Sequence, residues 1–162
     1  MSITYLLLGS NKGDRMYYIS KARTRIEQNA GIITGASGIY ETEPWGTKSG
    51  NYFYNQVICL RTELSPERLM KFIEFAETDL GRERTEERYI ERTIDIDILF
   101  YNKTIVNIPG LIIPHDKLHL RKFVLVPMAE IAADLVHPVF RKTITQLLED
   151  CKDKLSVKPI NR

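Results

Sequence analysis

The chain has 162 residues, of which 43% are hydrophobic and 27% are charged. A chain of this length most naturally forms one domain, and we expect that domain to span residues 1–162. Its 23 Lys and Arg against 21 Asp and Glu give a net charge of +2, too balanced to indicate a nucleic-acid or anionic-membrane partner. Any anion that the protein binds must therefore be held by a local cluster of basic residues.

The cysteines and the first residues indicate the cellular setting. Cys59 and Cys151 have neither a disulfide-framework nor a metal-ligand spacing, which fits a reducing compartment. The start of the chain lacks the charged and long apolar regions of a signal peptide, and no apolar run reaches the ~20 residues of a membrane span. We expect a soluble, cytoplasmic protein that acts as a monomer.

The first 62 residues predict a strand, a helix and two more strands. The apolar run over 3–8 predicts a buried strand, and a turn leads from it into a helix from about 15 to 28. Residues 32–42 and 53–62 have the composition of a second and a third strand. The loop over 45–51 holds two glycines and a tryptophan, which suits a mobile flap.

A second helix and a highly charged segment follow. Ser65-Pro66-Glu67 is a strong helix start, and the apolar period predicts a helix that ends at Gly81 and packs on the same sheet face as the first. Arginines and glutamates are interleaved from Gly81 to Thr93. Such a run is commonly a solvated, salt-bridged loop. Because this one leads into a strand with two carboxylates, it is also a candidate phosphate-binding arm.

Asp95 and Asp97 lie in the next predicted strand. Side chains alternate along a strand, so the two carboxylates fall on one face, about 6.5 to 7 Å apart, while Ile96 and Ile98 fall on the other. Two aspartates on one face repel each other unless a cation offsets them, and Mg²⁺ takes carboxylate and phosphate oxygens as ligands. The pair therefore predicts either a metal platform for phosphate chemistry or an acidic, solvated strand face.

The rest of the chain predicts four short elements. They are a return strand over 104–106, an apolar run that ends at His115, a helix from about 124 to 131, and a last helix that opens at a capping box over 143–146. The tail from Ser156 is expected to be frayed. His115 has basic residues close behind it and suits a phosphate contact, although a lone histidine is more often structural. Phe123 suits either the core or a binding site.

The order strand, helix, strand, strand, helix, strand predicts an α+β fold with a ferredoxin-like βαββαβ core. The sheet should be mainly antiparallel, with helices packed on one face and the other face free for a site. Additional C-terminal elements after residue 104 should edge or cover that free face.

Several spaced motifs together resemble one known family, 6-hydroxymethyl-7,8-dihydropterin pyrophosphokinase of folate biosynthesis. The resemblance covers residues 3 to about 140. The motifs that carry it are Gly9-Ser10-Asn11, Gly13-Asp14, Tyr40-x-Thr42, Gly46, Phe53-x-Asn55, Gly81-Arg82-x-Arg84, Arg92-Thr93-Ile94-Asp95-Ile96-Asp97-Ile98-Leu99, Pro114-His115 and Arg121-x-Phe123.

The resemblance implies an enzyme of ferredoxin-like fold with two substrates. It would transfer the β,γ-pyrophosphoryl unit of ATP to the hydroxymethyl oxygen of 6-hydroxymethyl-7,8-dihydropterin, releasing AMP, with two Mg²⁺ ions. Asp95 and Asp97 would hold both metals and, with Arg82 and Arg92, would form the catalytic set. The ATP contacts implied by the resemblance are Glu77, Arg82, Arg84, Arg92, Ile98, His115 and Arg121. The implied pterin contacts are Thr42, Pro44, Trp45, Phe53, Asn55, Tyr89 and Phe123, with Phe53 and Phe123 sandwiching the ring.

The chain departs from the family in two places. The family often reads Arg-Trp-Gly-Pro-Arg-Thr before the first aspartate, whereas this chain reads Arg88-Tyr89-Ile90-Glu91-Arg92-Thr93. Tyr89 still offers an aromatic group there. Trp45 stands where the family commonly has a smaller apolar residue, so the flap is expected to pack differently over the pterin. No general base is evident in the sequence.

Two other classes of function remain open at this point. A ferredoxin-like RNA-binding module would stack bases on its open sheet face, but Asp95 and Asp97 would repel a phosphate backbone there unless a metal is bound. A metal-dependent phosphohydrolase or nucleotidyltransferase could use the same two carboxylates. The products formed from ATP distinguish these possibilities.

Overall fold

The computed structural model describes residues 1–46, 50–82 and 91–160. Arg84 and Tyr89, together with part of the predicted flap, lie outside these residues. The elements in chain order are β1 (Ser2–Ser10), α1 (Arg15–Asn29), β2 (Ile32–Ala36), β3 (Tyr40–Thr42), β4 (Phe53–Thr62), α2 (Pro66–Asp79), β5 (Asp95–Tyr101), β6 (Val106–Ile108), β7 (Leu111–Ile113), a 3-10 turn η1 (Leu118–Leu120), α3 (Lys122–Ala132), α4 (Ile144–Asp150) and β8 (Val157–Pro159).

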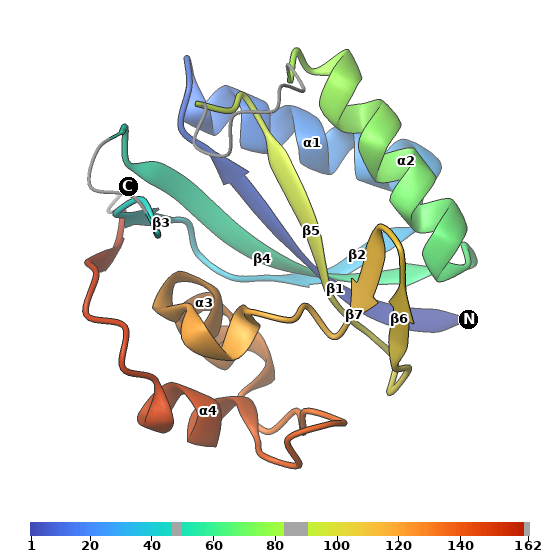
Figure 1. Cartoon of the computed structure of the whole chain (residues 1–162). Helices are drawn as coiled ribbons and strands as arrows, with labels where there is room; N and C mark the ends of the chain where they lie inside the picture. Colours follow the sequence, from blue (N-terminus) through green and yellow to red (C-terminus); the bar gives the residue numbers. More distant parts are fainter. Residues whose placement is uncertain (47–49, 83–90, 161–162) are drawn as a thin grey trace.

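A six-stranded antiparallel sheet forms the centre of the molecule (Figure 1). Its strand order is β5-β1-β4-β3-β8, and β2 also pairs with β4. β6 and β7 form a separate hairpin. The sequence of β1, α1, the β2/β3 strand, β4, α2 and β5 confirms the predicted α+β, ferredoxin-like arrangement, with C-terminal elements added to it.

One face of the sheet is covered by α1 and α2, as the sequence predicts. Asp14 and Ser65 cap these helices by accepting hydrogen bonds from the backbone N–H groups of Tyr17 and Arg68. Apolar residues from both helices share one core with the strands, because the 3.6-residue period puts them on the helix side that faces the sheet. The fully buried members from the helices are Ile19, Ala22, Ile26, Leu69, Ile73 and Ala76.

The opposite face has a second apolar core, but only over part of its length. Leu7, Val57 and Leu99 project from β1, β4 and β5 and pack with Val124 and Met128 of α3 and with buried residues of α4. In Figure 1, α1 and α2 lie together at the top of the view, and α3 and α4 lie at the bottom. The added C-terminal helices therefore cover one end of the face predicted to be free, and the other end holds the candidate site.

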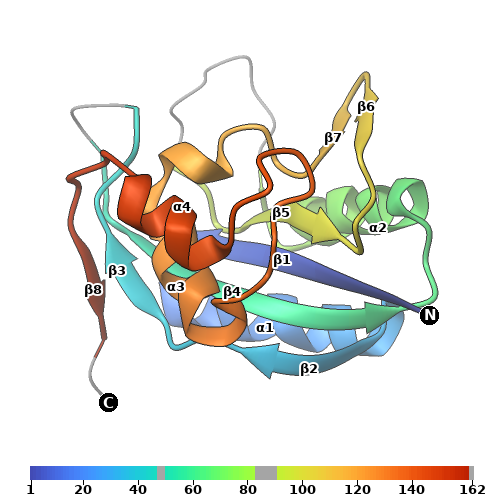
Figure 2. The ribbon, with the colours of Figure 1, turned by 90° about the horizontal axis from the view of Figure 1, so that it is seen from below.

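Three local predictions differ from the structure. The predicted strand over 32–42 is divided into β2 and β3, because Ser37 turns out of the ladder and binds Val57 through both its backbone N–H and its hydroxyl. The predicted return strand over 104–106 lies instead at Val106–Ile108. The tail predicted to be frayed forms β8, which runs beside β3 at the edge of the sheet (Figure 2). None of the helices in the described part of the chain is long and apolar enough to cross a membrane.

Candidate active site

A cavity of about 450 Å³ opens on the sheet face that α3 only partly covers. Its walls come from β1, β3, β4 and β5, from residues 43–46, 50 and 91–92, and from the start of α3. Residues that the sequence assigned to two substrates and to the metals meet in this one cavity. Those residues are Thr42, Pro44, Trp45, Phe53, Asn55, Arg92, Asp95, Asp97, Arg121 and Phe123.

The two aspartates of β5 face the cavity together. Asp95 is paired with Gly9, and Asp97 with Leu7, in the ladder between β5 and β1. The alternate residues of β5, which include Ile96, point to the core under α1 and α2. The strand periodicity therefore brings both carboxylates to one side of the sheet, with access to a cavity.

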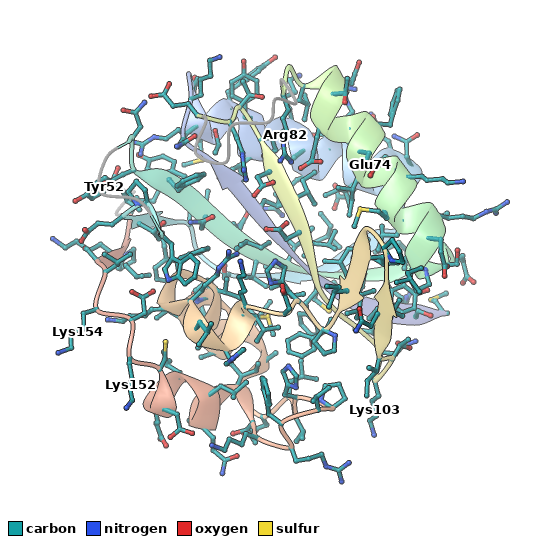
Figure 3. The ribbon with its side chains drawn as sticks, viewed as in Figure 1. Tyr52, Glu74, Arg82, Lys103, Lys152 and Lys154 are labelled. Carbon is teal, nitrogen blue, oxygen red and sulfur yellow. The ribbon has the colours of Figure 1, made fainter. Side chains whose placement is uncertain are left out.

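Asp95 is the centre of an ion-pair network. The Arg82 guanidinium donates to its Oδ1 at 2.8 Å, and the Arg92 guanidinium donates to its Oδ2 at 3.2 Å. Arg82 also pairs with Glu77, whose carboxylate accepts a hydrogen bond from the backbone N–H of Ile96 at 2.9 Å. Glu77 is 3% exposed, so it lies beneath Arg82 and not among the residues that line the large cavity. Arg82 lies between α2 and the start of β5 in Figure 3.

The carboxyl group of Asp97 is in a very different environment. Burial, followed by the neighbouring charge of Asp95, raises its pKa from 3.8 to about 8, while Arg121 acts in the opposite direction. A carboxylate beside a second carboxylate in a low-dielectric site favours its protonated form unless a cation is present. Asp97 is therefore a group that gains strongly from a bound cation.

A flat, partly apolar region lies beside the carboxylates. Asn55 is 3% exposed and donates from Nδ2 to the Thr42 hydroxyl at 2.7 Å. Gly9 makes room for this amide, since a Cβ atom there would lie 2.7 Å from Asn55 Oδ1 and 3.6 Å from the Phe53 ring. A paired amide edge next to aromatic rings is suited to a heterocycle that has both a π-face and polar edge atoms.

Arg121 joins this aromatic region to the carboxylates. Its guanidinium lies 4.6 Å from the centre of the Trp45 ring and 5.7 Å from that of Phe123, which are cation–π distances. Burial lowers the pKa of Arg121, whereas Asp97 and Asp95 act to raise it. A cation held between aromatic rings and two carboxylates is positioned to contact an anionic group of a ligand.

A second, smaller cavity of about 230 Å³ adjoins the first through Asp97. Ile98 and His115, both predicted to contact the nucleotide, line it together with Met70 and the hairpin residues Leu111 and Ile112. His115 Nδ1 accepts a hydrogen bond from the backbone N–H of Lys117 at 3.2 Å. Burial, and then the nearby Arg121, lower the pKa of His115 below its usual value.

Sequence reasoning missed several residues of these two cavities. Gly9 and Asn11 line the large cavity and belong to the Gly9-Ser10-Asn11 motif, so that motif was a signal that could have identified them. Lys117 and Glu91 line it as well. Nothing in the sequence marks Met70 as a residue of the smaller cavity, because it looks like an ordinary apolar residue of α2.

The fold and the site define the class of protein before any comparison. A ferredoxin-like α+β sheet that presents two carboxylates, a group of arginines and an aromatic pocket suits an enzyme that transfers phosphate groups to a ring-bearing acceptor. The model of the family 7,8-dihydro-6-hydroxymethylpterin-pyrophosphokinase (HPPK) matches residues 5–133. The chain belongs to this family.

Curated relatives agree with the family match. The chain is 40% identical over 131 residues to the 2-amino-4-hydroxy-6-hydroxymethyldihydropteridine pyrophosphokinase of Bacillus subtilis, a match that covers 80% of this chain and 78% of the relative. It is 36% identical to the enzyme of the same name from Aquifex aeolicus, over 98% of this chain and 96% of the relative. It is also 37% identical to the folic acid synthesis protein fol1 of Pneumocystis carinii, over 96% of this chain but only 21% of that longer protein.

Solved structures show the same fold. A Plasmodium falciparum HPPK-DHPS with SDX-DHP superposes with a TM-score of 0.75 at 17% identity, over 92% of this chain and 44% of that chain. The chain thus spans less than half the length of that structure and about a fifth of the Pneumocystis protein. Enzymes of this family are pyrophosphokinases of folate biosynthesis that use ATP as co-substrate and 6-hydroxymethyl-7,8-dihydropterin as acceptor.

Proposed function

We propose that the chain transfers the pyrophosphoryl group by in-line displacement at the β-phosphorus of ATP, with two Mg²⁺ ions bound at Asp95 and Asp97. A bond forms between the pterin hydroxymethyl oxygen and the β-phosphorus, the bond from that phosphorus to the α-phosphate oxygen breaks, and AMP leaves. The observation that carries the proposal is the position of the two carboxylates. They lie in the same cavity as the aromatic pocket, and Asp97 also borders the second cavity.

The chemistry of the carboxylates fits divalent cations. Both are hard oxygen donors, and burial together with the charge of Asp95 raises the pKa of Asp97, so a bound cation would favour its ionised form. Among the residues that the structure describes, no group of three or more His, Cys, Asp and Glu could hold a metal, so phosphate oxygens would complete the coordination. When bound, the ions would neutralise the triphosphate and lower the pKa of the attacking hydroxyl.

Arg82 and Arg92, which pair with Asp95, would also contact the phosphates of the substrate. Arg82 and Arg92 now occupy both carboxylate oxygens of Asp95. We propose that they turn to the transferred phosphates when the cations bind, which exchanges one set of opposite-charge contacts for another. Guanidinium groups suit this exchange because they stay charged and bind phosphate oxygens in pairs. Glu77 then acts by holding Arg82, and Arg84 is expected to join the phosphate contacts.

The pterin is proposed to lie in the aromatic part of the large cavity. Phe53 and Phe123 would contact the two ring faces, and Asn55 and Thr42 would pair with the polar edge. Pro44, Trp45 and Tyr89 are the remaining proposed contacts. An unpaired polar atom of a buried ring costs on the order of 1 to 3 kcal/mol, so the Asn55 amide would select for a ring with matching donors and acceptors.

The nucleotide is proposed to reach from the carboxylates into the second cavity. Its apolar lining, which includes Ile98 and Met70, suits the base of ATP, and His115 lies at the same cavity wall. The charge of Arg121 acts on groups of both cavities. It interacts with Asp95 and Asp97 and with His115. We assign His115 and Arg121 to phosphate contacts. Positioning and electrostatics would then supply most of the catalysis.

Incubation with ATP, Mg²⁺ and 6-hydroxymethyl-7,8-dihydropterin tests the reaction directly. We expect AMP and a pyrophosphorylated pterin in equal amounts, and loss of both products in EDTA. ADP, free phosphate or a nucleotide attached to the acceptor would instead identify a phosphohydrolase or a nucleotidyltransferase. Binding of RNA without Mg²⁺ would identify the RNA-binding alternative.

We also propose that the chain acts as a single-domain cytoplasmic monomer. The balanced charge of the sequence and the two carboxylates of β5 in the cavity support the absence of a nucleic-acid partner. Light scattering coupled to size exclusion measures the oligomeric state, and a mass near 18.8 kDa is the expected result.

A further inference from the structure

One carboxylate ties the last turn of α3 to the start of β3. Glu130 of α3 accepts a hydrogen bond at Oε2 from the backbone N–H of Gly38 at 2.9 Å. The same oxygen accepts a hydrogen bond from the Tyr40 hydroxyl at 3.2 Å. Burial, and then the charge of Glu130, raise the pKa of the Tyr40 hydroxyl, which therefore keeps its proton and donates well above neutral pH.

Both elements that Glu130 joins also line the large cavity. α3 contacts β3 and β4, and it lies beside β3 in Figure 2. Its first turn carries Phe123, which lies about 10 Å from Glu130 along the helix axis at ~1.5 Å per residue. β3 carries Thr42, whose hydroxyl accepts the hydrogen bond of the Asn55 amide. Glu130 therefore connects the helix behind one wall of the proposed pterin pocket to the strand behind another.

Apolar packing by itself does not fix the position of α3 along the sheet. Val124 and Met128 hold the helix to the sheet through the hydrophobic effect, which has no preferred direction. A hydrogen bond has a defined length and angle, so the two bonds to Glu130 fix where the end of α3 lies relative to Tyr40. Tyr40 is the ladder partner of Asn55, so this point of β3 lies directly beside the polar edge of the proposed pocket.

We propose that Glu130 is a positioning residue for the acceptor, because by holding α3 against β3 it sets the distance between Phe123 and the edge formed by Thr42 and Asn55. The inference rests on the proposed placement of the pterin in this part of the cavity. Glu130 is exposed and does not line the cavity, so it acts through the two elements and not by contact with a ligand. The two carboxylates lie on β5, which β1 and β4 separate from β3, so acceptor binding should respond more than nucleotide binding.

The test measures two affinities, one for α,β-methylene ATP with Mg²⁺ and one for 6-hydroxymethyl-7,8-dihydropterin in the presence of both. The analogue lacks the bond that breaks, so the affinities do not depend on turnover. Glu130→Ala should weaken pterin binding about tenfold and change the affinity for the analogue by less than about twofold. Glu130→Gln should retain the pterin affinity of the wild type, because its amide oxygen still accepts both hydrogen bonds.

A second variant tests the contact from the other side. Tyr40→Phe removes only the hydroxyl and should weaken pterin binding about threefold, since the bond from Gly38 remains. Combined with Glu130→Ala it should have no further effect, because both changes remove the same contact. Glu74→Ala removes an exposed glutamate from the outer side of α2, and this matched control should leave both affinities unchanged (Figure 3).

The outcomes separate positioning from stability and from activity. Unchanged pterin affinity in Glu130→Ala would overturn the inference, and so would equal losses for the two ligands, which would show a purely structural contact. Failure of Glu130→Gln to retain pterin affinity would overturn it as well. Wild-type protein that binds the pterin but releases no AMP from ATP would overturn the proposed function instead, and the effect of Glu130→Ala on pterin affinity would still be measured.

Discussion

Asp97 shows how a single residue can be placed at the expense of stability. Its folded-state pKa of about 8 lies above its usual value of 3.8, so the folded protein favours the protonated acid. The contribution of Asp97 to the free energy of unfolding then falls as pH rises from about 4 through about 8, since over this range the unfolded state releases the proton first.

The amide variant measures this cost. Asp97→Asn should be more stable than the wild type above pH 8 in EDTA, by about 1 to 3 kcal/mol, and the difference should shrink toward pH 4. Urea unfolding at a series of pH values is the measurement. Parallel stability profiles for the two proteins would contradict the environment described for Asp97.

Removal of either carboxylate should stop the reaction without unfolding the protein. Asp95→Ala and Asp97→Ala should lower the rate of AMP formation by a factor of at least about 100, because each removes a proposed metal ligand. Circular dichroism should show folded protein, since both side chains face the cavity and not the core. Near wild-type turnover in either variant would show that the metal assignment is wrong.

Phe123 distinguishes a binding wall from a core position. It packs partly against the core beneath α3 and also lines the cavity. Phe123→Ala should weaken pterin binding about tenfold and leave ATP binding within about twofold, because the lost aromatic contact belongs to one ligand. Isothermal titration with each substrate gives both numbers. Equal losses for the two substrates would indicate a role in packing only.

At the scale of elements, the sequence predicted those with strong periodicity. β4 occupies the predicted residues 53–62, α1 begins at the predicted residue 15, and α2 begins at its predicted cap, Ser65. β3 and β8 were not separable in the sequence because each has three residues, too few for a period to emerge. Their pairing depends on neighbours that only the folded chain supplies.

Gly9 of β1 shows what an element contributes to the site. Gly9→Ala should displace the Asn55 amide and raise the KM for the pterin about tenfold, with little change in the KM for ATP, because the added Cβ lies 2.7 Å from Asn55 Oδ1. Steady-state kinetics with each substrate varied in turn is the measurement. Gly35→Ala, in a strand glycine whose added Cβ meets only Cys59 at 3.7 Å, is the control and should leave both constants unchanged.

At the scale of the whole molecule, the site lies where one of two cores ends. The core under α1 and α2 runs the length of the sheet, whereas the core under α3 and α4 stops short and leaves the carboxylates uncovered. The resemblance to the family named Asp95, Asp97 and eight other residues that line this cavity. The sequence could not predict that Arg82 and Arg92 pair with Asp95, or that Met70 lines a second cavity, because those contacts arise from packing between distant segments.

The strand β8 makes the proposed pterin pocket depend on residues far from any motif. Val157 pairs with Thr42, and the Ser156 carbonyl accepts a hydrogen bond from the backbone N–H of Glu43 at 3.1 Å. A protein cut before residue 156 would keep every side chain assigned to chemistry and still lose the brace behind Thr42. Shortened versions prepared for assay or crystallisation should therefore recognise their acceptor poorly while binding nucleotide normally.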